Sequence, residues 1–595
     1  MNNKLRRQRR FAVARKFPGQ STSFPMHSYP ALARSLAAPA DRLTAAVIAT
    51  LLVVALFTFR DYGLGWDDYG QARYGELLLA YYASGFTDHS AFSFYNLFYY
   101  GGGFDLSAAA LEKILPFDVF ETRRLLGALV GIAGLAIVWG TARRLGGPIA
   151  GVAALVLLAT CPLYYGHMFI NAKDTPFAVA MIFLLYSLVR AFEEHPRPRP
   201  GTIILFGIAL GLTIGTRIIG GIAVVFAVIA AVILFTVEAR ALGAKTSALR
   251  ISNLVGRLAL ALPLAYLVMG VIWPWGIQAP LNPLRALEYY SHFWEKPWKE
   301  LFDGARILIP EMPPTYVPKL CLLKLPEIFV ALAISGTAGA MIAVLRGGIE
   351  PWRRAALALL ISAAMLPIMI TVVTRPVLYN GIRHFVFVIP PFAVLAGLAA
   401  AYLFEHLRAY ARPAATIGVT AFSALIALTV VDLVRIHPYQ YALFNHVAGG
   451  VSGAHNRYMI DYWGLGLKEA SEALLERLER ENITPPKSRK WRVAVCGPSH
   501  TVGFELGPDF EASQDTKGAD FAVSLGTYYC AKLNAPVLAV AEREGVVFAR
   551  AYDLRGRSIA STYTPPAPDD LKTVKQKVTT FWHYDEEEPS SVRTP

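Results

Sequence analysis

Apolar stretches of about twenty residues alternate with short charged loops along the chain up to about residue 435. A run of this length can cross the hydrocarbon core of a bilayer as a helix. The pattern predicts an α-helical polytopic membrane protein with about eleven transmembrane helices in a domain over 42–435. Their expected positions are 42–60, 124–143, 148–166, 175–192, 201–217, 219–236, 257–275, 326–345, 355–373, 384–404 and 414–433.

The distribution of Lys and Arg predicts how these helices are oriented. The tail over 1–41 is rich in basic residues and has no acid before Asp41, which predicts a cytoplasmic N-terminus. With the tail inside, the cytoplasmic loops each hold at least two Lys or Arg; they are 143–146, 193–200, 238–257, 346–354 and 405–412. The remaining loops then lie on the outer face; they are 61–123, 166–174, 276–325, 374–383 and everything after Asp432.

The composition agrees with a membrane protein, since hydrophobic residues make up 54% of the 595 residues. Much of the net charge of +14 lies in the tail and the cytoplasmic loops, where it orients the protein and contacts anionic lipids. We therefore expect membrane lipids and no nucleic acid as partners. The first apolar run lacks a convincing cleavage site, which argues against a cleavable signal peptide.

The composition changes after the last apolar stretch, where we expect a small α/β domain over 436–562 and a polar tail over 563–595. Leucines at helical spacing predict an amphipathic helix over 465–481. Short buried strands are expected at 491–496, 519–525, 535–541 and 545–552. Cys496 and Cys530 could pair in the oxidising compartment outside the membrane, although free thiols are the outcome that we favour.

The first outer loop, 61–123, begins with the adjacent carboxylates Asp67 and Asp68. Amphipathic patterns predict short helices over 74–82 and 106–115, with many aromatic residues between them. Aromatic residues at this density suit helices that lie in the interfacial layer of the membrane, or a belt that only anchors the loop. We interpret this loop as the catalytic face of a membrane enzyme.

Ionisable residues from distant parts of the chain gather on the predicted outer face. Such groups at the edge of a membrane are costly, and they are therefore candidates for function. The candidate site residues are Asp67, Asp68, Arg73, Tyr74, Glu76, His167, Asn171, Lys173, Asp174, Arg217, Arg383 and His384.

These residue types suit transfer of a sugar from a lipid phosphate. A carboxylate at the interface can accept a proton from an attacking hydroxyl. Arg, Lys and His at the same depth can hold the phosphate and stabilise its charge as it leaves. Two adjacent carboxylates also suggest a divalent cation, but no ligand spacing points to a particular metal, and no other cofactor is indicated.

Simpler roles compete with these functional ones. Asp67 could cap the helix that follows it, and Asp174 could cap the next helix or interact with its dipole. Lys173 could extend along the apolar surface to reach the membrane interface. Arg217 could pair with an acid across the helix bundle.

The motifs resemble the GT-C superfamily of integral-membrane glycosyltransferases. The likeness is closest to the bacterial branch related to protein O-mannosyltransferases and to lipid A aminoarabinose transferase. Members of that branch have an Asp-Asp or Asp-Glu pair in the first outer loop, an acid at the start of the fourth span, and basic residues before a late span. The matching segments are Asp67-Asp68, Arg73-Tyr74-Gly75-Glu76, Asp174, and Gly381-Ile382-Arg383-His384-Phe385 to Pro390-Pro391. The predicted C-terminal α/β domain on the outer face is a further feature in which the chain resembles the aminoarabinose transferase.

The resemblance implies an inverting transferase that takes a sugar from a polyprenyl-phosphate donor, with Asp67 or Asp68 as the general base. We expect it in the inner membrane of a bacterium, with the N-terminus cytoplasmic and the C-terminal domain periplasmic. The acceptor hydroxyl would belong to a lipid, a glycan or a protein. We assign donor-phosphate binding to Lys173, Arg217, Arg383 and His384. The remaining candidates would position substrates; they are Asp174, Arg73, Tyr74, Glu76, His167 and Asn171.

Two other functions remain as alternatives. A transporter or flippase also needs polar residues inside a helix bundle, but it predicts charges near mid-membrane and two related halves. Here the charges gather at one face. A non-catalytic envelope assembly protein would use the C-terminal domain to bind partners.

Overall fold

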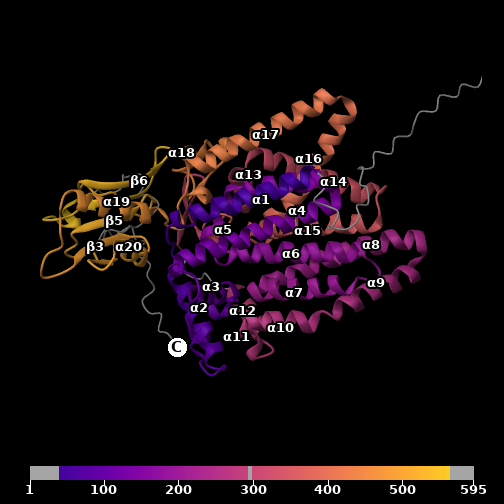
Figure 1. Ribbon diagram of the computed structural model, residues 1–595, viewed down its shortest axis with the longest axis horizontal. Helices are drawn as coiled ribbons and strands as arrows, with labels where there is room; N and C mark the ends of the chain where they lie inside the picture. The colour runs from indigo at the N-terminus through magenta and orange to yellow at the C-terminus, as the bar shows by residue number, and fades with distance from the viewer. Residues whose placement is uncertain (1–38, 292–297, 563–595) are drawn as a thin grey trace, which may run out of the picture.

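A computed structural model describes residues 39–291 and 298–562. Figure 1 shows a bundle of long helices with a smaller α/β domain at one end. The polar tail predicted over 563–595 and nearly all of the basic tail predicted over 1–41 lie outside the described residues. The structure therefore confirms the predicted class, an α-helical membrane protein with a small C-terminal sheet domain.

Within the described residues, nine helices are long and apolar enough to cross a membrane. They are built from α1 (Pro39–Thr58), α4 (Val119–Ala159), α6 (Asp174–Glu193), α8 (Ala223–Leu242), α9 (Ala244–Ala259) with α10 (Leu262–Ile272), α14 (Glu327–Arg346), α15 (Pro351–Thr374), α16 (Ile389–Tyr410) with its preceding 3-10 turn η7 (Arg383–Val388), and α17 (Arg412–Arg435). The shorter α7 (Pro200–Thr216) is also apolar. Helices α6 and α16 are the most deeply buried, whereas α1 and α17 expose most of their apolar side chains.

Helix α4 consists of two antiparallel legs. The backbone at Gly147 has a φ of 83°, outside the helical region, and glycine adopts this value without strain. Beyond this point the chain turns back, because Gly151 packs against Trp139, and the Tyr164 hydroxyl donates to the carbonyl of Gly131 at 2.8 Å. The two spans predicted over 124–143 and 148–166 therefore correspond to the two legs and the short helix that follows.

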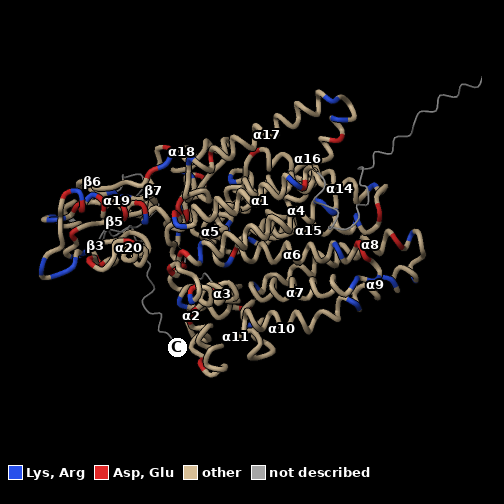
Figure 2. Tube along the Cα trace, viewed as in Figure 1, with Lys and Arg blue, Asp and Glu red and all other residues tan. Residues whose placement is uncertain are grey.

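The charged residues confirm a polarity along the bundle. Figure 2 shows Lys and Arg at the ends of α8, α9, α16 and α17 that point away from the C-terminal domain. Helices α2 (Asp68–Ala83), α3 (Gly103–Glu112) and α5 (Pro162–Ile170) lie at the opposite end, beside that domain. Helices α2 and α3 approach so closely that a side chain at Gly75 would collide with the backbone of Asp105.

The C-terminal domain contains a five-stranded sheet in the order β4-β3-β5-β7-β6. Strand β3 (Trp491–Cys496) pairs in parallel with β4 (Phe510–Ser513) and β5 (Phe521–Leu525), while β7 (Val546–Asp553) pairs antiparallel with β5 and β6 (Val537–Arg543). The four predicted strands are confirmed, and β4 is an additional short edge strand. The predicted amphipathic helix is α19 (Gly466–Arg480), which buries Leu467, Leu474 and Leu478.

Cys496 and Cys530 form a disulfide, with their Cα atoms 5.8 Å apart. The expectation that they remain free thiols is therefore wrong. The spacing of 34 residues gave no sign of pairing, because only the fold of the sheet brings the end of β3 next to the loop that follows β5. The other two cysteines, Cys161 and Cys321, are free.

The remaining short elements lie at the end of the bundle beside the C-terminal domain or within that domain. They are η2 (Phe59–Asp61), η3 (Ser90–Ser93), η4 (Leu97–Tyr99), η5 (Ile218–Ile222), α11 (Pro274–Gln278), α12 (Asn282–Ser291), β1 (Lys299–Phe302), β2 (Ala305–Leu308), η6 (Ile309–Glu311), α13 (Tyr316–Lys324), η8 (Gln440–Ala442), η9 (His446–Ala448), α18 (Gly450–Ala454), α20 (Ser499–Leu506) and α21 (Ile559–Thr562).

Candidate functional site

Charged residues from four segments meet at the end of the bundle beside the C-terminal domain. Asp67 precedes α2, Asp174 begins α6, Arg217 follows α7 and Arg383 begins η7. A terminal nitrogen of Arg383, Nη1, lies 3.9 Å from a carboxylate oxygen of Asp67 and 3.9 Å from one of Asp174. Arg217 forms an ion pair with Asp174. The structure thus brings together acidic and basic residues that are far apart in the sequence, as we expected.

The adjacent carboxylates Asp67 and Asp68 have different surroundings. Asp68 is buried and receives two hydrogen bonds from Arg124, at 3.0 and 2.7 Å, and a third from the backbone N–H of Gly65 at 2.6 Å. Arg124 also donates to the carbonyl of Gly63 at 2.6 Å. Both oxygens of Asp68 are therefore engaged in holding the start of α2 against α4.

The Asp67 carboxylate is more exposed and less engaged than that of Asp68. It occupies the position before the first turn of α2, yet its side chain makes no capping hydrogen bond. Its side chain is 43% exposed, against 3% for Asp68. The capping role considered for Asp67 is therefore not the one its side chain performs. The geometry favours Asp67 over Asp68 as the group that can take up a proton.

Asp174 is held by a network of buried polar side chains. Asn171 donates to Asp174 at 2.6 Å, and the side-chain oxygen of Asn171 accepts the backbone N–H groups of Lys173 and Asp174 at 3.1 and 2.7 Å. Asn171 rather than Asp174 therefore caps the start of α6. The carboxylate of Asp174 is left to bind Arg217 and to face Arg383.

The same network fixes the protonation state of His167. Because the oxygen of Asn171 accepts backbone N–H groups, its amide nitrogen donates to Nδ1 of His167 at 3.1 Å. Nε2 of His167 then carries the proton and donates to the Tyr462 hydroxyl at 2.9 Å. Burial lowers the pKa of His167 to about 3, so the ring is neutral. His167 therefore positions Asn171 and Tyr462 and supplies no positive charge.

Lys173 supplies a positive charge that no neighbouring acid neutralises directly. Its ammonium lies 4.4 Å from the centre of the Tyr100 ring, and the guanidinium of Arg217 lies 5.6 Å from the same ring. Within the described residues, no carboxylate lies within 4.0 Å of the Lys173 ammonium. Burial lowers the pKa of Lys173, whereas the nearby Asp67 and Asp105 raise it. This arrangement suits an anionic ligand.

Aromatic rings enclose Arg383. Its guanidinium lies 5.0 Å from the ring of Tyr379 and 4.9 Å from that of Trp463. The Nε atoms of Arg383 and Arg217 and the Nδ1 atom of His384 are buried without a hydrogen-bond partner among the described residues. His384 also packs against Tyr379, with ring centres 5.1 Å apart. The site therefore holds polar nitrogens that a bound ligand could engage.

Three of the predicted residues have other local roles. Arg73 and Glu76 pair with each other at 2.5 Å on the exposed side of α2. Tyr74 is buried among Leu78 and other apolar side chains, and its hydroxyl lies 3.5 Å from the carbonyl of Tyr100. The structure does not draw these three residues into the charged cluster, and a role for them in positioning substrate stays a prediction.

Sequence reasoning missed the residues that support the cluster. Arg123 pairs with the buried Asp105, and Arg124 pairs with Asp68. Trp463 and Tyr462 come from the chain beyond the last span, more than 70 residues from Arg383. The one available signal was the pair Arg123-Arg124 at an apolar helix start, where charged residues require partners.

Glu300 holds the loop that leads to Arg383. This buried carboxylate on β1 accepts the Tyr316 hydroxyl at 2.5 Å and the backbone N–H groups of Asn380 and Gly381 at 2.6 and 3.3 Å. Burial raises the pKa of Glu300 from 4.5 to about 7. The folded protein therefore keeps a proton on Glu300 at pH values where the unfolded chain has lost it.

This difference predicts a pH dependence of stability. Because the folded-state pKa is the higher one, the stabilisation from the bound proton is complete below about pH 4.5 and is lost as the pH rises toward 7. Glu300→Gln lacks this ionisation. The difference in melting temperature, wild type minus Glu300→Gln, should therefore decrease between pH 5 and 7.5. Thermal unfolding of both proteins in detergent measures it. A constant difference across this range would contradict the assignment.

Two of the carboxylates in the cluster are already bound by neighbouring side chains. Asp68 is engaged by Arg124, and Asp174 is engaged by Arg217 and Asn171. In the part of the chain that the structure describes, no group of three or more His, Cys, Asp or Glu side chains is arranged to hold a metal ion. Arg124 and Gly65 already engage both oxygens of Asp68, and a divalent cation at Asp67 and Asp68 stays a prediction.

Comparison with known proteins gives a family match over part of the chain. Residues 109–268 match the model of the dolichyl-phosphate-mannose-protein mannosyltransferase family. This segment contains His167, Asn171, Lys173, Asp174 and Arg217. The match confirms the resemblance to GT-C membrane glycosyltransferases and supports a transferase activity. No curated protein sequence matches the chain.

Several solved structures are similar to this chain at low identity. ArnT from Cupriavidus metallidurans bound to undecaprenyl phosphate is 18% identical, with 86% of this chain and 97% of ArnT covered and a TM-score of 0.45. Archaeal oligosaccharyltransferase AglB from Archaeoglobus fulgidus, in complex with an inhibitory peptide and a dolichol-phosphate, is 13% identical, with 80% of this chain and 69% of AglB covered and a TM-score of 0.41.

Proposed function

We propose that this membrane protein transfers a sugar from a polyprenyl-phosphate donor to a hydroxyl acceptor, with inversion at the anomeric carbon. The observation that carries the proposal is the position of the exposed Asp67 carboxylate beside Arg383, which also faces Asp174. An acid that can accept a proton thus lies next to cations that can hold a phosphate. The resemblance to GT-C transferases supports the same reaction.

In this reaction the acceptor oxygen forms a bond to the anomeric carbon while the bond from that carbon to the phosphate oxygen breaks. Asp67 takes the hydroxyl proton as the oxygen attacks, which makes the oxygen a better nucleophile. The polyprenyl phosphate leaves with the bonding electron pair and gains negative charge. Attack from the side opposite to the phosphate inverts the configuration at the anomeric carbon.

The cations of the cluster stabilise the leaving phosphate. Arg383 can bind phosphate oxygens through two parallel N–H groups, and Lys173 acts as a point charge. Both are largely shielded from water, so their interaction with the phosphate is stronger than it would be in solution. Arg217 and His384 lie close by, and each has a buried nitrogen that no residue within 39–291 or 298–562 engages. Asp174 orients Arg217 and limits repulsion among the cations.

The outer, periplasmic face is the side that best suits this site. The cluster lies at the end of the bundle opposite to most of the loop arginines, as the positive-inside rule requires for an outer-face site. The disulfide between Cys496 and Cys530 lies in the domain at the same end, and disulfides persist in oxidising compartments. We therefore place the protein, as part of this proposal, in a bacterial inner membrane, with the predicted domain boundaries at 42–435 and 436–562.

Turnover of defined donors by the purified protein in nanodiscs tests this function. We expect release of polyprenyl phosphate from at least one member of a panel of polyprenyl-phosphate sugars when an extract of envelope lipids and glycans is present. A parallel reaction with a chelator tests whether a divalent cation contributes. Failure to turn over or bind any of these donors would refute the proposal. If a donor is turned over, mass spectrometry of envelope glycolipids and glycoproteins in a deletion strain identifies the acceptor.

A further inference from the structure

A cavity lies between the C-terminal domain and the loops on the membrane domain. Its volume is about 500 Å³, within the range of roughly 300–1,000 Å³ that is typical of small-molecule sites. One wall comes from β5, β7 and the loop after β5, and the other from the chain between α18 and α19 and the β1–β2 turn. None of the charged residues around Asp67 lines it. The cavity is therefore distinct from the proposed catalytic site.

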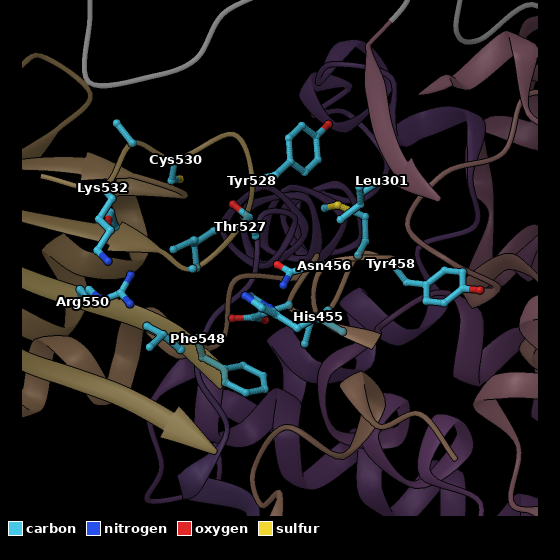
Figure 3. A pocket seen from close by; sticks show the side chains of 18 of the residues that line it. Leu301, His455, Asn456, Tyr458, Thr527, Tyr528, Cys530, Lys532, Phe548 and Arg550 are labelled. Carbon is cyan, nitrogen blue, oxygen red and sulfur yellow. The ribbon is translucent and has the colours of Figure 1, made fainter. Parts of the chain in front are cut away.

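The cavity is lined by an excess of basic side chains. Lys532, Arg550, Arg306 and His455 line it, and Figure 3 shows Lys532 and Arg550 on its C-terminal-domain side with His455 nearer its middle. In the region that the structure describes, no carboxylate lies within 4.0 Å of a charged nitrogen of Lys532 or Arg550 or of the His455 ring nitrogens. Arg306 packs over the ring of Tyr528.

Among the described residues that line the cavity, the one acid is Asp461, and hydrogen bonds already engage it. Asp461 accepts the Tyr441 hydroxyl and the backbone N–H groups of Gly464, Leu465 and Gly466, the last three at 3.0, 3.0 and 2.9 Å. Its charge is thus directed toward the start of α19 and away from Lys532 and Arg550. The free face of the cavity is consequently positive.

Hydroxyl and amide groups complete the lining. Asn456, Thr527 and Ser524 contribute polar side chains beside His455, and Figure 3 shows Asn456 and Thr527 close to the centre of the cavity. Such groups can exchange hydrogen bonds with the hydroxyl groups of a ligand. Phe548 also lines the cavity, but its ring is buried and stacks on that of Tyr439, so the exposed lining is mainly polar.

The wall that carries Lys532 is held in place from two sides. The disulfide between Cys496 and Cys530 fixes the loop after β5 to the end of β3. The Tyr528 hydroxyl donates to the carbonyl of Lys299 and joins the same loop to β1. The cavity is therefore preformed, and binding would require little ordering of the chain.

We propose that this cavity binds an anionic, hydroxyl-rich ligand of the saccharide class, such as a sugar that carries a carboxylate or a phosphate. Lys532 and Arg550 bind the anionic group, and Asn456 and Thr527 bind the sugar hydroxyls. The segment from His455 to Asp461 continues directly into Tyr462 and Trp463, which contact His167 and Arg383. The cavity therefore lies beside the proposed catalytic site. Binding of the ligand there does not require the transfer reaction.

Binding measurements on the full-length protein in nanodiscs without any lipid donor test this proposal. The probes are glucuronate, glucose 6-phosphate, neutral glucose and inorganic phosphate, each followed by calorimetry. We expect the two anionic sugars to bind more tightly than glucose and more tightly than phosphate alone. Arg550→Ala and Lys532→Ala should each raise the dissociation constant of the anionic sugars about tenfold or more.

Lys517→Ala is the matched control, because Lys517 is an exposed lysine of the same domain that does not line the cavity. Unchanged binding in Lys517→Ala, with loss in Arg550→Ala and Lys532→Ala, supports the proposal. Binding that survives in both cavity variants would place the anion elsewhere, for example at Lys173 and Arg383, and would overturn it. Failure of both anionic sugars to bind the wild type at millimolar concentration would also overturn it. Transfer activity in the nanodisc assay is a separate readout, so either proposal can fail alone.

Discussion

Asp67→Asn should reduce the turnover number of the transferase about 10²–10⁴-fold, which is the usual contribution of a general base. The amide that replaces the carboxylate cannot accept the hydroxyl proton. Binding of the donor should persist, because the substitution removes a negative charge from beside the donor-phosphate site. The folded protein should be little affected, since the Asp67 side chain is 43% exposed and caps no helix. Steady-state turnover and thermal unfolding of the purified variant are the measurements.

Asp68→Asn is the matched control for Asp67→Asn, and it should behave in the opposite way. Asp68 is buried and receives two hydrogen bonds from Arg124, so the substitution weakens a buried ion pair. Breaking such a pair lowers the free energy of unfolding by about 3–5 kcal/mol. We expect a lower melting temperature and reduced yield, while the protein that remains folded keeps substantial turnover. Full activity in Asp67→Asn, or loss of turnover confined to Asp68→Asn, would reverse the assignment.

The contrast between these two residues shows where sequence analysis stopped. Their adjacency and position after the first span marked them as candidates. The sequence alone, however, gives no difference between the two aspartates. They are distinguished by Arg124, which lies 56 residues further along the chain and reaches only one of them. A single sequence carries no signal for a pairing of that kind, because it depends on how α2 packs against α4.

Elements with a strong local pattern were predicted well. The apolar spans and the strands β3, β5, β6 and β7 follow directly from continuous or alternating apolar residues. Strand β4 was missed because its four residues, Phe510–Ser513, include only two apolar side chains and pair on one edge. The disulfide was also missed, since it depends on the arrangement of strands rather than on cysteine spacing.

The charged cluster was predicted from one idea about topology, namely that alternate loops share a membrane face. That idea brought together Asp67, Asp174, Arg217 and Arg383, and the structure places them within one site. It also included Arg73 and Glu76, which share the face but pair with each other at its surface. The sequence therefore predicts which charged residues share a membrane face. Which of those residues contact one another is decided by how the helices pack side by side.

Arg383→Gln should produce the second large loss, because Arg383 lies between both carboxylates and contacts Tyr379 and Trp463 through its guanidinium. If Arg383 stabilises the leaving phosphate, its removal should lower kcat/KM for the lipid donor about 10²–10³-fold, which is typical of losing one preorganised donor. The dissociation constant of polyprenyl phosphate should rise at least about tenfold. Both quantities are measured in nanodiscs, by donor-dependent turnover and by direct binding.

Two further variants separate charge from geometry in this experiment. Arg383→Lys keeps the positive charge but cannot form two parallel hydrogen bonds, so we expect partial recovery of binding and a smaller recovery of turnover. Arg435→Gln removes an exposed arginine at the end of α17 and should leave both quantities unchanged. If Arg383→Gln retained normal kcat/KM and normal affinity for polyprenyl phosphate, the anion would have to be bound by Lys173 and Arg217 alone. Complete recovery in Arg383→Lys would instead show that the charge at this position suffices and that the planar guanidinium adds nothing.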